Sequence, residues 1–245
     1  MKDLYSFGFF DTARIISAVS REVFGVSVFD FGNTEESGGS LAELIAAALR
    51  ELAPGTDHVR IVSDFLGAIP EIKRLLYLDA ESILSSDPAA DDIREVICAY
   101  PGFFAIFCHR TANLFYKMSV PALPRFISEY VHSRTGIDIH PGAEIGERFS
   151  IDHGTGIVIG ETAVIGDRVR LYQGVTIGAK SFPRNDKGEF DRTVKRHPTI
   201  GNGVVIYASA AIFGADTVIG DGAVIGANVR IAHSVEPYAR VYCEK

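Results

Sequence analysis

The chain has 245 residues, 47% of them hydrophobic and 22% charged, which is enough apolar material for one or two domains with a packed core. Its formal net charge of -7 argues against nucleic acid as a partner of the chain as a whole. The three cysteines, Cys98, Cys108 and Cys243, fit neither a disulfide framework nor a metal-site spacing, which is typical of reduced cytoplasmic thiols. The N-terminus carries charged residues, unlike a secretory signal, and the longest apolar run, 97–108, is too short to span a bilayer. We therefore expect a soluble cytoplasmic protein with no membrane contact.

Residues 1 to about 135 have the pattern of a helical region. Apolar residues recur at helical spacing over 7–24, and Ser40 with Glu43 forms a capping box in front of a helix over 41–52. Asp87 followed by Pro88 is a helix start signal, with the aspartate at the cap and the proline at the first helical position. Further helices are expected over 59–78, 89–99, 102–117 and 121–133.

From residue 139 to about 236 an aliphatic residue recurs at every sixth position, with two short slips and one polar loop. The repeating residues are Ile139, Ile145, Ile151, Ile159, Ile165, Leu171, Ile177, Ile200, Ile206, Ile212, Ile219, Ile225 and Ile231. A hexapeptide period is the signature of a parallel β-helix, in which each block gives one strand and one corner. Strands of a β-sandwich would instead alternate between turns of variable spacing.

The sequence therefore predicts an α+β chain in three parts. An all-α domain over 1–135 precedes a parallel β-helix over 136–235, and 236–245 is a short tail. The first coil of a solenoid exposes strand edges and apolar side chains, so we expect the helices to cap it and also to carry oligomer contacts.

The repeat breaks at two places where a site is expected. One break holds Asp152 to Gly156, and the other is the charged loop over 179–199. A solenoid has no pocket of its own, so we expect ligands to bind between subunits or under such a loop, and a trimer would supply three equivalent grooves.

His153 in the first break has a candidate partner. Asp138 lies 15 residues earlier, nearly one coil of three hexapeptides, so the two side chains are expected on neighbouring rungs. A carboxylate beside a histidine fixes its tautomer and stabilises the imidazolium, as a general base requires. A surface histidine with an unrelated aspartate is the alternative, and the spacing does not decide between them.

Basic residues mark the second break. Arg196 and His197 close the loop, and the guanidinium fork of Arg196 suits a substrate carboxylate, although a solvated loop charge is the alternative. Lys180 and the other loop cations could meet phosphates, but Asp186, Glu189 and Asp191 dilute their charge.

At these residues the chain resembles the serine O-acetyltransferases of the hexapeptide acyltransferase family. The matching stretches are DPA (87–89), DIHPGAEIG (138–146), IDHGTGIVIGETAVIG (151–166) and RHPTIGNGVVI (196–206). The resemblance implies a left-handed parallel β-helix with a helical N-terminal domain, in trimers that often pair into hexamers. It also implies transfer of acetyl from acetyl-CoA to the hydroxyl of L-serine, giving O-acetyl-L-serine for cysteine synthesis, with inhibition by L-cysteine. Acetyl-CoA would be a co-substrate, with no permanently bound cofactor and no metal.

The resemblance also implies roles for individual residues. The catalytic pair would be His153 and Asp138, and the serine-binding residues would be Asp87, Asp152, Arg196 and His197. Acetyl-CoA contacts are implied at Gly178, Lys180, Ala208 and Ala227.

The chain departs from the family pattern in three places. The loop after residue 178 is longer than in the enterobacterial type, and the segment after residue 235 lacks the usual Pro-Ala motif. The sequence ends in Cys243, Glu244 and Lys245 rather than in the isoleucine by which many members dock into cysteine synthase, so a stable complex with that enzyme is not expected.

Three other functions remain open from the residues. An acetyltransferase acting on a sugar or another hydroxyl would keep His153 but would have no use for a carboxylate anchor. A metalloenzyme of the β-helical carbonic anhydrase type would need three histidines, for which His140, His153 and His197 are the available set. A non-catalytic solenoid scaffold would bind no CoA.

Overall fold

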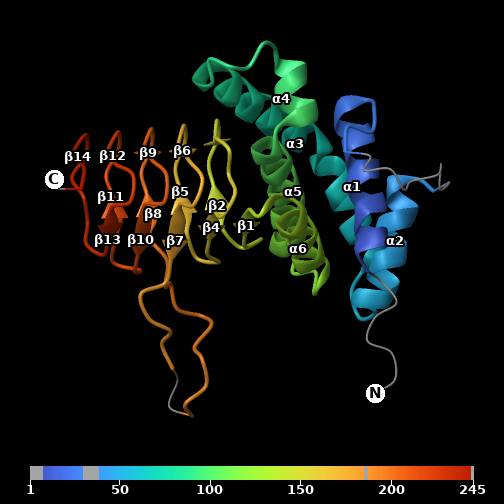
Figure 1. Cartoon of the computed structure of the whole chain (residues 1–245). Coiled ribbons are helices and arrows are strands. Elements are labelled where there is room, and N and C mark those ends of the chain that lie inside the picture. Colours follow the sequence, from blue (N-terminus) through green and yellow to red (C-terminus); the bar gives the residue numbers. More distant parts are fainter. Residues whose placement is uncertain (1–7, 30–38, 185–186, 244–245) are drawn as a thin grey trace.

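The computed structural model describes residues 8–29, 39–184 and 187–243. In Figure 1 the helices gather at one end of the molecule, and the strands wind away from them toward the C-terminal end. Outside the described residues lie the predicted helix start at Phe7, most of the polar stretch over 33–39, the loop residue Asp186, and the last two residues. The predicted order, helices first and parallel strands after them, is confirmed.

The described part of the N-terminal region contains α1 (Phe9–Phe24), α2 (Leu41–Leu52), α3 (His58–Ser86), α4 (Ile93–Ala99), α5 (Pro101–Lys117) and α6 (Leu123–Thr135). The capping box predicted at α2 is present. Ser40 Oγ accepts from the backbone N–H of Glu43 at 3.3 Å, and the Glu43 carboxylate accepts from the N–H of Ser40 at 2.7 Å. None of these helices, over the residues described, is both long and apolar enough to cross a membrane.

The boundary between α3 and α4 differs from the prediction. α3 continues to Ser86, past the predicted end near residue 78, because its buried face extends through Ile83. Asp87 was expected to cap the next helix, and this is wrong. Asp92 caps α4, and its carboxylate accepts from two N–H groups of the first turn at 2.8 and 2.9 Å. Asp87 instead closes a turn by accepting from the N–H of Ala89 at 2.8 Å, so its side chain lies between two helices.

Fourteen short strands follow in the described residues, and their named partners are all parallel. They are β1 (Asp138–Ile139), β2 (Glu144–Ile145), β3 (Ser150–Ile151), β4 (Val158–Ile159), β5 (Val164–Ile165), β6 (Arg170–Leu171), β7 (Thr176–Gly178), β8 (Thr199–Ile200), β9 (Val205–Ile206), β10 (Ala211–Phe213), β11 (Val218–Ile219), β12 (Val224–Ile225), β13 (Arg230–Ile231) and β14 (Arg240–Val241).

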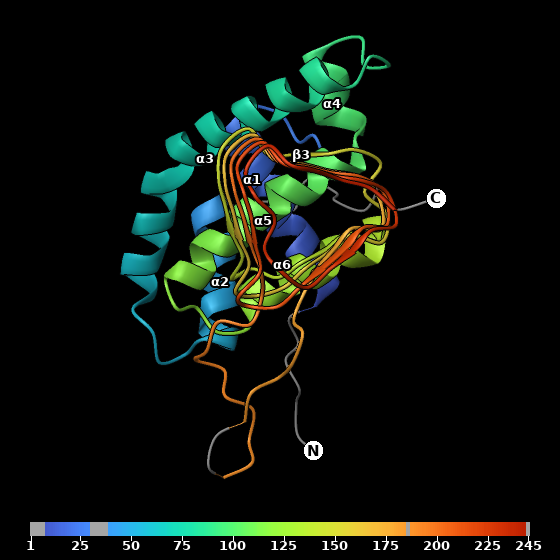
Figure 2. The same cartoon turned by 90° about the vertical axis from the view of Figure 1, so that its left-hand side faces the viewer.

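The strands form three sheets, which the chain visits in turn. The first sheet holds β1, β4, β7, β10 and β13, the second holds β2, β5, β8 and β11, and the third holds β3, β6, β9, β12 and β14. Figure 2 looks along this coil and shows the successive rungs lying over one another, with the loop between β7 and β8 projecting outward. Each rung thus has three sides and three corners, and residues at one corner form a column along the coil.

The repeating aliphatic residues fill the inside of the coil, as the period of six predicts. All thirteen are buried except Ile145, which is half-buried at the helical end. A second inward column was missed, because it consists of small or mixed residues four positions later in the block, such as Ala143, Phe149, Ala163 and Val169. The strands also continue past Val235, where β14 pairs with β12.

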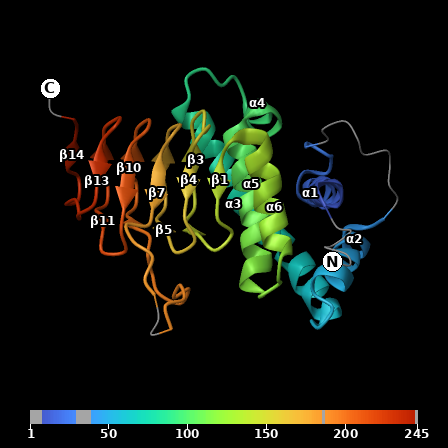
Figure 3. The ribbon, with the colours of Figure 1, turned by 60° about the horizontal axis from the view of Figure 1, so that its bottom comes forward.

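The helices lie against the open first rung of the coil, as Figure 3 shows for α5 and α6 beside β1. Asn113 Nδ2 donates to the carbonyl oxygens of Pro141 and Ala143 at 2.8 and 3.1 Å. Arg110 donates to the carbonyl oxygen of Gly146 at 2.8 Å. These side chains satisfy backbone groups that have no strand beyond them, so the first rung is fixed relative to the helices.

Candidate active site

The predicted site residues fall at two different corners of the coil. We call the turns from the third sheet into the first the 3–1 corner, and the turns from the first sheet into the second the 1–2 corner. His153 follows β3 and lies at the 3–1 corner, whereas Arg196 and His197 precede β8 and lie at the 1–2 corner. One side of the coil, a strand of the first sheet, separates the two corners. The separation is roughly five residues, or on the order of 15 Å of extended chain.

His153 projects from the 3–1 corner into solvent. Two extra residues in this turn bring Gly154 so close to the core that a Cβ there would stand 2.5 Å from Ile137 Cδ1, and His153 is left outside with a φ of 58°. Its side chain is 73% exposed, and its Nε2 lies 3.7 Å from Asp152 Oδ1. The structure places Asp138 at the start of β1 but records no hydrogen bond between its carboxylate and His153, so their pairing stays a prediction.

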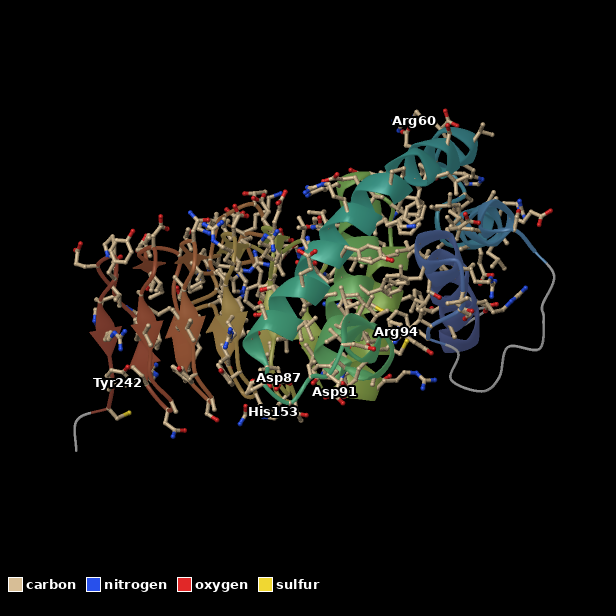
Figure 4. All side chains as sticks on the ribbon, turned by 90° about the horizontal axis from the view of Figure 1, so that it is seen from above. Arg60, Asp87, Asp91, Arg94, His153 and Tyr242 are labelled. Atoms are coloured by element: carbon tan, nitrogen blue, oxygen red, sulfur yellow. The ribbon has the colours of Figure 1, made fainter. Side chains whose placement is uncertain are left out.

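Asp87 joins this corner from the helical region. In Figure 4 Asp87 and His153 lie next to each other where the turn after α3 meets the coil. The pKa of Asp87 is lowered, mainly by the hydrogen bond from the Tyr100 hydroxyl and then by the N–H of Ala89, with His153 and Arg170 contributing from nearby. The 3–1 corner therefore presents ionised carboxylate beside an accessible imidazole, an arrangement that suits a cationic group on a ligand.

The 1–2 corner holds Arg196 in a fixed position. Its Nη2 donates to the carboxylate of Glu161, and its backbone N–H donates to Thr162 Oγ1 at 2.9 Å. The side chain of Arg196 is only 15% exposed, and its Nη1 is buried with no hydrogen-bond partner among the described residues. One arm of the guanidinium is thus anchored, and the other is left without an acceptor among the described residues.

His197 is held beside it as a neutral ring. Its Nδ1 accepts from the N–H of Thr162 at 3.1 Å, which leaves the ring proton on Nε2. Burial, and after it the neighbouring charge of Arg196, lowers the pKa of His197 to about 4. The ring lies directly over Gly160, where any side chain would overlap it. At neutral pH His197 can therefore donate one hydrogen bond without carrying charge.

Glu161 connects this corner to the helices. The hydroxyl of Tyr116 in α5 donates to Glu161 Oε1 at 2.9 Å, and the Tyr116 ring meets His140 edge-on with centroids 5.9 Å apart. Burial would raise the pKa of Glu161, but the Tyr116 hydrogen bond together with His140 and Arg196 lowers it overall. Between this cluster and the long loop lies a cavity of about 540 Å³, lined by His140, Glu161, Phe182, Pro183, Phe190, Asp191, Arg192 and Arg196.

The residues predicted to contact acetyl-CoA divide between the same two corners. Gly178 ends β7 and Lys180 follows it at the 1–2 corner, whereas Ala208 and Ala227 lie at the 3–1 corner. Within the chain, the structure does not bring the two pairs together. The three histidines of the metalloenzyme alternative divide in the same way, and no group of three or more His, Cys, Asp or Glu side chains in the described residues is arranged to hold a metal ion.

Sequence reasoning missed the partners that fix these residues. Glu161 and Thr162 stand inside the GETAVIG motif, but their contacts with Arg196 span 35 and 34 residues and have no signal in local spacing. Tyr100 likewise reaches Asp87 across 13 residues and two helix ends.

Comparison with known proteins places the chain among named relatives. No family model matches it. It is 55% identical over 171 residues to the plasmid serine acetyltransferase of Synechococcus elongatus, a stretch that covers 70% of this chain and 53% of that relative. It is 44% identical over 168 residues to the serine acetyltransferase of Bacillus subtilis, covering 69% of this chain and 73% of that protein. The chain thus spans only about half the length of the first relative.

Solved structures show the same likeness over most of the fold. Serine acetyltransferase isoform 3 from Entamoeba histolytica, in complex with cysteine, superposes with a TM-score of 0.80 at 32% identity, covering 94% of this chain and 81% of that one. The Neisseria gonorrhoeae enzyme in complex with serine gives a TM-score of 0.67 at 29% identity, covering 100% and 98%. The Brucella abortus enzyme in complex with coenzyme A gives 0.63 at 26% identity, covering 96% and 80%. The resemblance read from the four sequence stretches is confirmed, and the chain belongs to the serine acetyltransferase family.

Proposed function

We propose that the chain is a serine O-acetyltransferase that moves acetyl from acetyl-CoA to the hydroxyl of L-serine, giving O-acetyl-L-serine for cysteine biosynthesis. The observation that carries this proposal is the half-engaged guanidinium of Arg196. Its buried Nη1 needs an acceptor, and an α-carboxylate supplies one with full charge complementarity. A sugar offers that arm only neutral hydroxyl oxygens, without the charge of a carboxylate, so the amino-acid acceptor is favoured over the sugar.

In the proposed reaction His153 acts as the general base. It takes the proton from the serine hydroxyl as that oxygen forms a bond to the thioester carbonyl carbon. The C–S bond then breaks, and the imidazolium returns the proton to the departing thiolate. Asp138 would orient the ring, Asp87 and Asp152 would hold the ammonium, and Arg196 with His197 would hold the carboxylate. Proton transfer of this kind contributes on the order of a hundred- to ten-thousand-fold, and positioning of the two substrates supplies much of the rest.

We also propose that the complete site forms between copies of the chain in a trimer. Half of the serine contacts and half of the CoA contacts belong to each corner. The separation of the corners, on the order of 15 Å, exceeds the length of a serine molecule. A groove between the 3–1 corner of one copy and the 1–2 corner of the next would unite both sets three times around the trimer.

Other parts of the proposal rest on the family. The coil over 136–235 is proposed to be a left-handed β-helix of hexapeptide rungs, and the helices over 1–135 to cap it and to pair trimers. Relatives solved with cysteine, serine and coenzyme A support L-cysteine as an inhibitor at the serine site and acetyl-CoA as the co-substrate. We further propose that the enzyme is cytoplasmic and has no permanently bound cofactor or metal. It is proposed to form no stable complex with cysteine synthase and to have no nucleic acid or membrane partner.

The test is release of free CoA thiol from acetyl-CoA by the purified protein, with L-serine and then with sugars and other hydroxyl compounds. We expect release that depends on L-serine, that L-cysteine suppresses in competition with L-serine, and that His153→Ala abolishes while the oligomer persists. Release with another acceptor only would contradict the serine-binding roles. No thiol release with any acceptor would favour the hypothesis of a non-catalytic solenoid scaffold. Turnover by the His153→Ala variant would contradict the proposed role of His153 as the base.

A further inference from the structure

Tyr100 binds the carboxylate of Asp87 from the far end of α4. It lies half-buried in the single-residue connection between α4 and α5. Its hydroxyl donates to Asp87 Oδ2 at 2.7 Å, while Asp87 Oδ1 accepts from the N–H of Ala89 at 2.8 Å. Both carboxylate oxygens are therefore fixed, and the lone pairs that remain keep one direction relative to the coil.

The position of Tyr100 is set by the coil itself. Pro101 begins α5 directly after it, and Gly102 packs so tightly that a Cβ there would stand 2.5 Å from the carbonyl oxygen of Ile151. Ile151 is followed at once by Asp152 and His153. The contact at Gly102 thus fixes the position of the Tyr100 hydroxyl relative to the 3–1 corner. Through its hydrogen bond, the hydroxyl fixes the position of the Asp87 carboxylate relative to the same corner.

We propose that Tyr100 is a positioning residue for substrate binding, which aims the Asp87 carboxylate at the ammonium group of L-serine beside His153. This inference rests on the proposed function. Asp87 is the proposed serine contact that comes from the helical region, because Asp152, Arg196 and His197 all belong to the coil. Its turn carries the exposed residues Pro88 and Ala89, so within the turn only the N–H of Ala89 holds the carboxylate. The hydrogen bond from Tyr100, which is anchored on the coil, is the contact that fixes the carboxylate relative to the coil.

The charges around the pair are consistent with this role. Tyr100 faces Asp87, Glu95 and Asp152, and the hydrogen bond to Asp87 is the main cause that raises the pKa of its hydroxyl to about 12. The hydroxyl therefore stays protonated and donating throughout the working pH range. Asp87 in turn faces the imidazole of His153 and the guanidinium of Arg170, as well as the donor hydroxyl.

The test compares Tyr100→Phe with the wild type, using Tyr238→Phe as the matched control because Tyr238 is 78% exposed at the far end of the coil. Phenylalanine keeps the ring and removes only the hydroxyl. We expect the KM for L-serine to rise about 3- to 10-fold through loss of one charge-assisted hydrogen bond. The KM for acetyl-CoA and kcat should stay within about twofold, and Tyr238→Phe should match the wild type.

Two further readouts separate positioning from a general structural effect. Without the hydroxyl the pKa of Asp87 rises. On the acid side of the fall that follows protonation of His153, the further fall of kcat/KM for L-serine that follows protonation of Asp87 should therefore move to higher pH in Tyr100→Phe. In an Asp87→Asn background the same change should have little further effect on the serine KM. An unchanged serine KM in Tyr100→Phe, or an equal effect with and without Asp87, would overturn the proposal.

Failure of the proposed function would look different. In that case the wild type itself would release no thiol with L-serine. The thermal unfolding midpoints of the wild type, Tyr100→Phe, Asp87→Asn and the double variant would then test the role of Tyr100. Losses in the double variant smaller than the sum of the single losses would retain it as the residue that positions Asp87, and additive losses would overturn that role.

Discussion

Gly160 decides where the imidazole of His197 lies, although it carries no side chain. The ring of His197 sits over the Gly160 backbone, with its Nδ1 held by Thr162 and only 7% of the residue exposed. A methyl group at residue 160 would occupy the space of the ring. Thr162 Oγ1 also accepts hydrogen bonds from the backbone N–H groups of Arg196 and His197. Movement of the ring would therefore disturb both proposed carboxylate contacts.

We therefore expect Gly160→Ala to weaken binding of L-serine at least tenfold, because the imidazole must leave its place beside Arg196. The measurement is KM for L-serine in the thiol-release assay, with the unfolding midpoint recorded for the same samples. Gly67→Ala is the control, because a Cβ on Gly67 in α3 has no atom within 4 Å and alanine favours the helix. A wild-type KM in Gly160→Ala would show that the ring position does not matter.

At the scale of elements, a buried ion pair joins α3 and α5 to the coil. Asp79 is fully buried, and its carboxylate accepts from the guanidinium of Arg110 at 2.5 and 2.8 Å and from the backbone N–H of Phe149 at 2.9 Å. Burial raises the pKa of Asp79, against the lowering effect of Arg110. With these contacts the pair is satisfied on both sides, so its components depend strongly on one another.

Asp79→Asn should lower the free energy of unfolding by about 3 to 5 kcal/mol, because it leaves the Arg110 charge buried without its counterion. Chemical denaturation at one fixed protein concentration measures this. Glu71→Gln is the control, since the Glu71–Arg74 pair is solvent-exposed and its loss should have a small effect. Equal losses in the two variants would mean that the buried pair contributes no more than a surface pair.

What the sequence predicts and what it misses depend on whether an interaction leaves a pattern in the sequence. The period of six predicts the coil, because each aliphatic residue stacks on an equivalent one in the next rung and the same residue type recurs along the chain. The Ser40–Glu43 capping box leaves a local pattern and is present. The end of α3 and the place of Asp87 were predicted wrongly, because a local helix start signal at Asp87 is overridden by packing that extends α3 and by the cap at Asp92. The partner of Arg196 lies 35 residues away and has no pattern of its own.

At the scale of the whole molecule, each copy presents two incomplete half-sites on opposite edges of its first sheet. The 3–1 corner carries the proposed base and the ammonium-binding carboxylates, and the 1–2 corner carries the proposed carboxylate-binding pair. If the trimer unites them, one subunit with a defective 3–1 corner can still supply an intact 1–2 corner to its neighbour. Two variants with defects at different corners could then complement each other in activity. A loss of stability in one coil would not be restored by its neighbour.

This arrangement predicts rescue by mixing two inactive variants. His153→Ala and Arg196→Ala chains, carrying different tags and assembled at equal amounts, should recover about a third of the wild-type thiol release in mixed trimers, because a trimer that holds both variants has the right order in one of its three neighbour pairs. The measurement uses mixed oligomers purified through both tags. His153→Ala mixed with Asp87→Ala is the control and should release no more thiol than the two variants do separately, since Asp87 and His153 face each other within one chain. No recovery in the first mixture would place the whole site within a single copy and would require Arg196 and His153 to meet by a rearrangement of the coil.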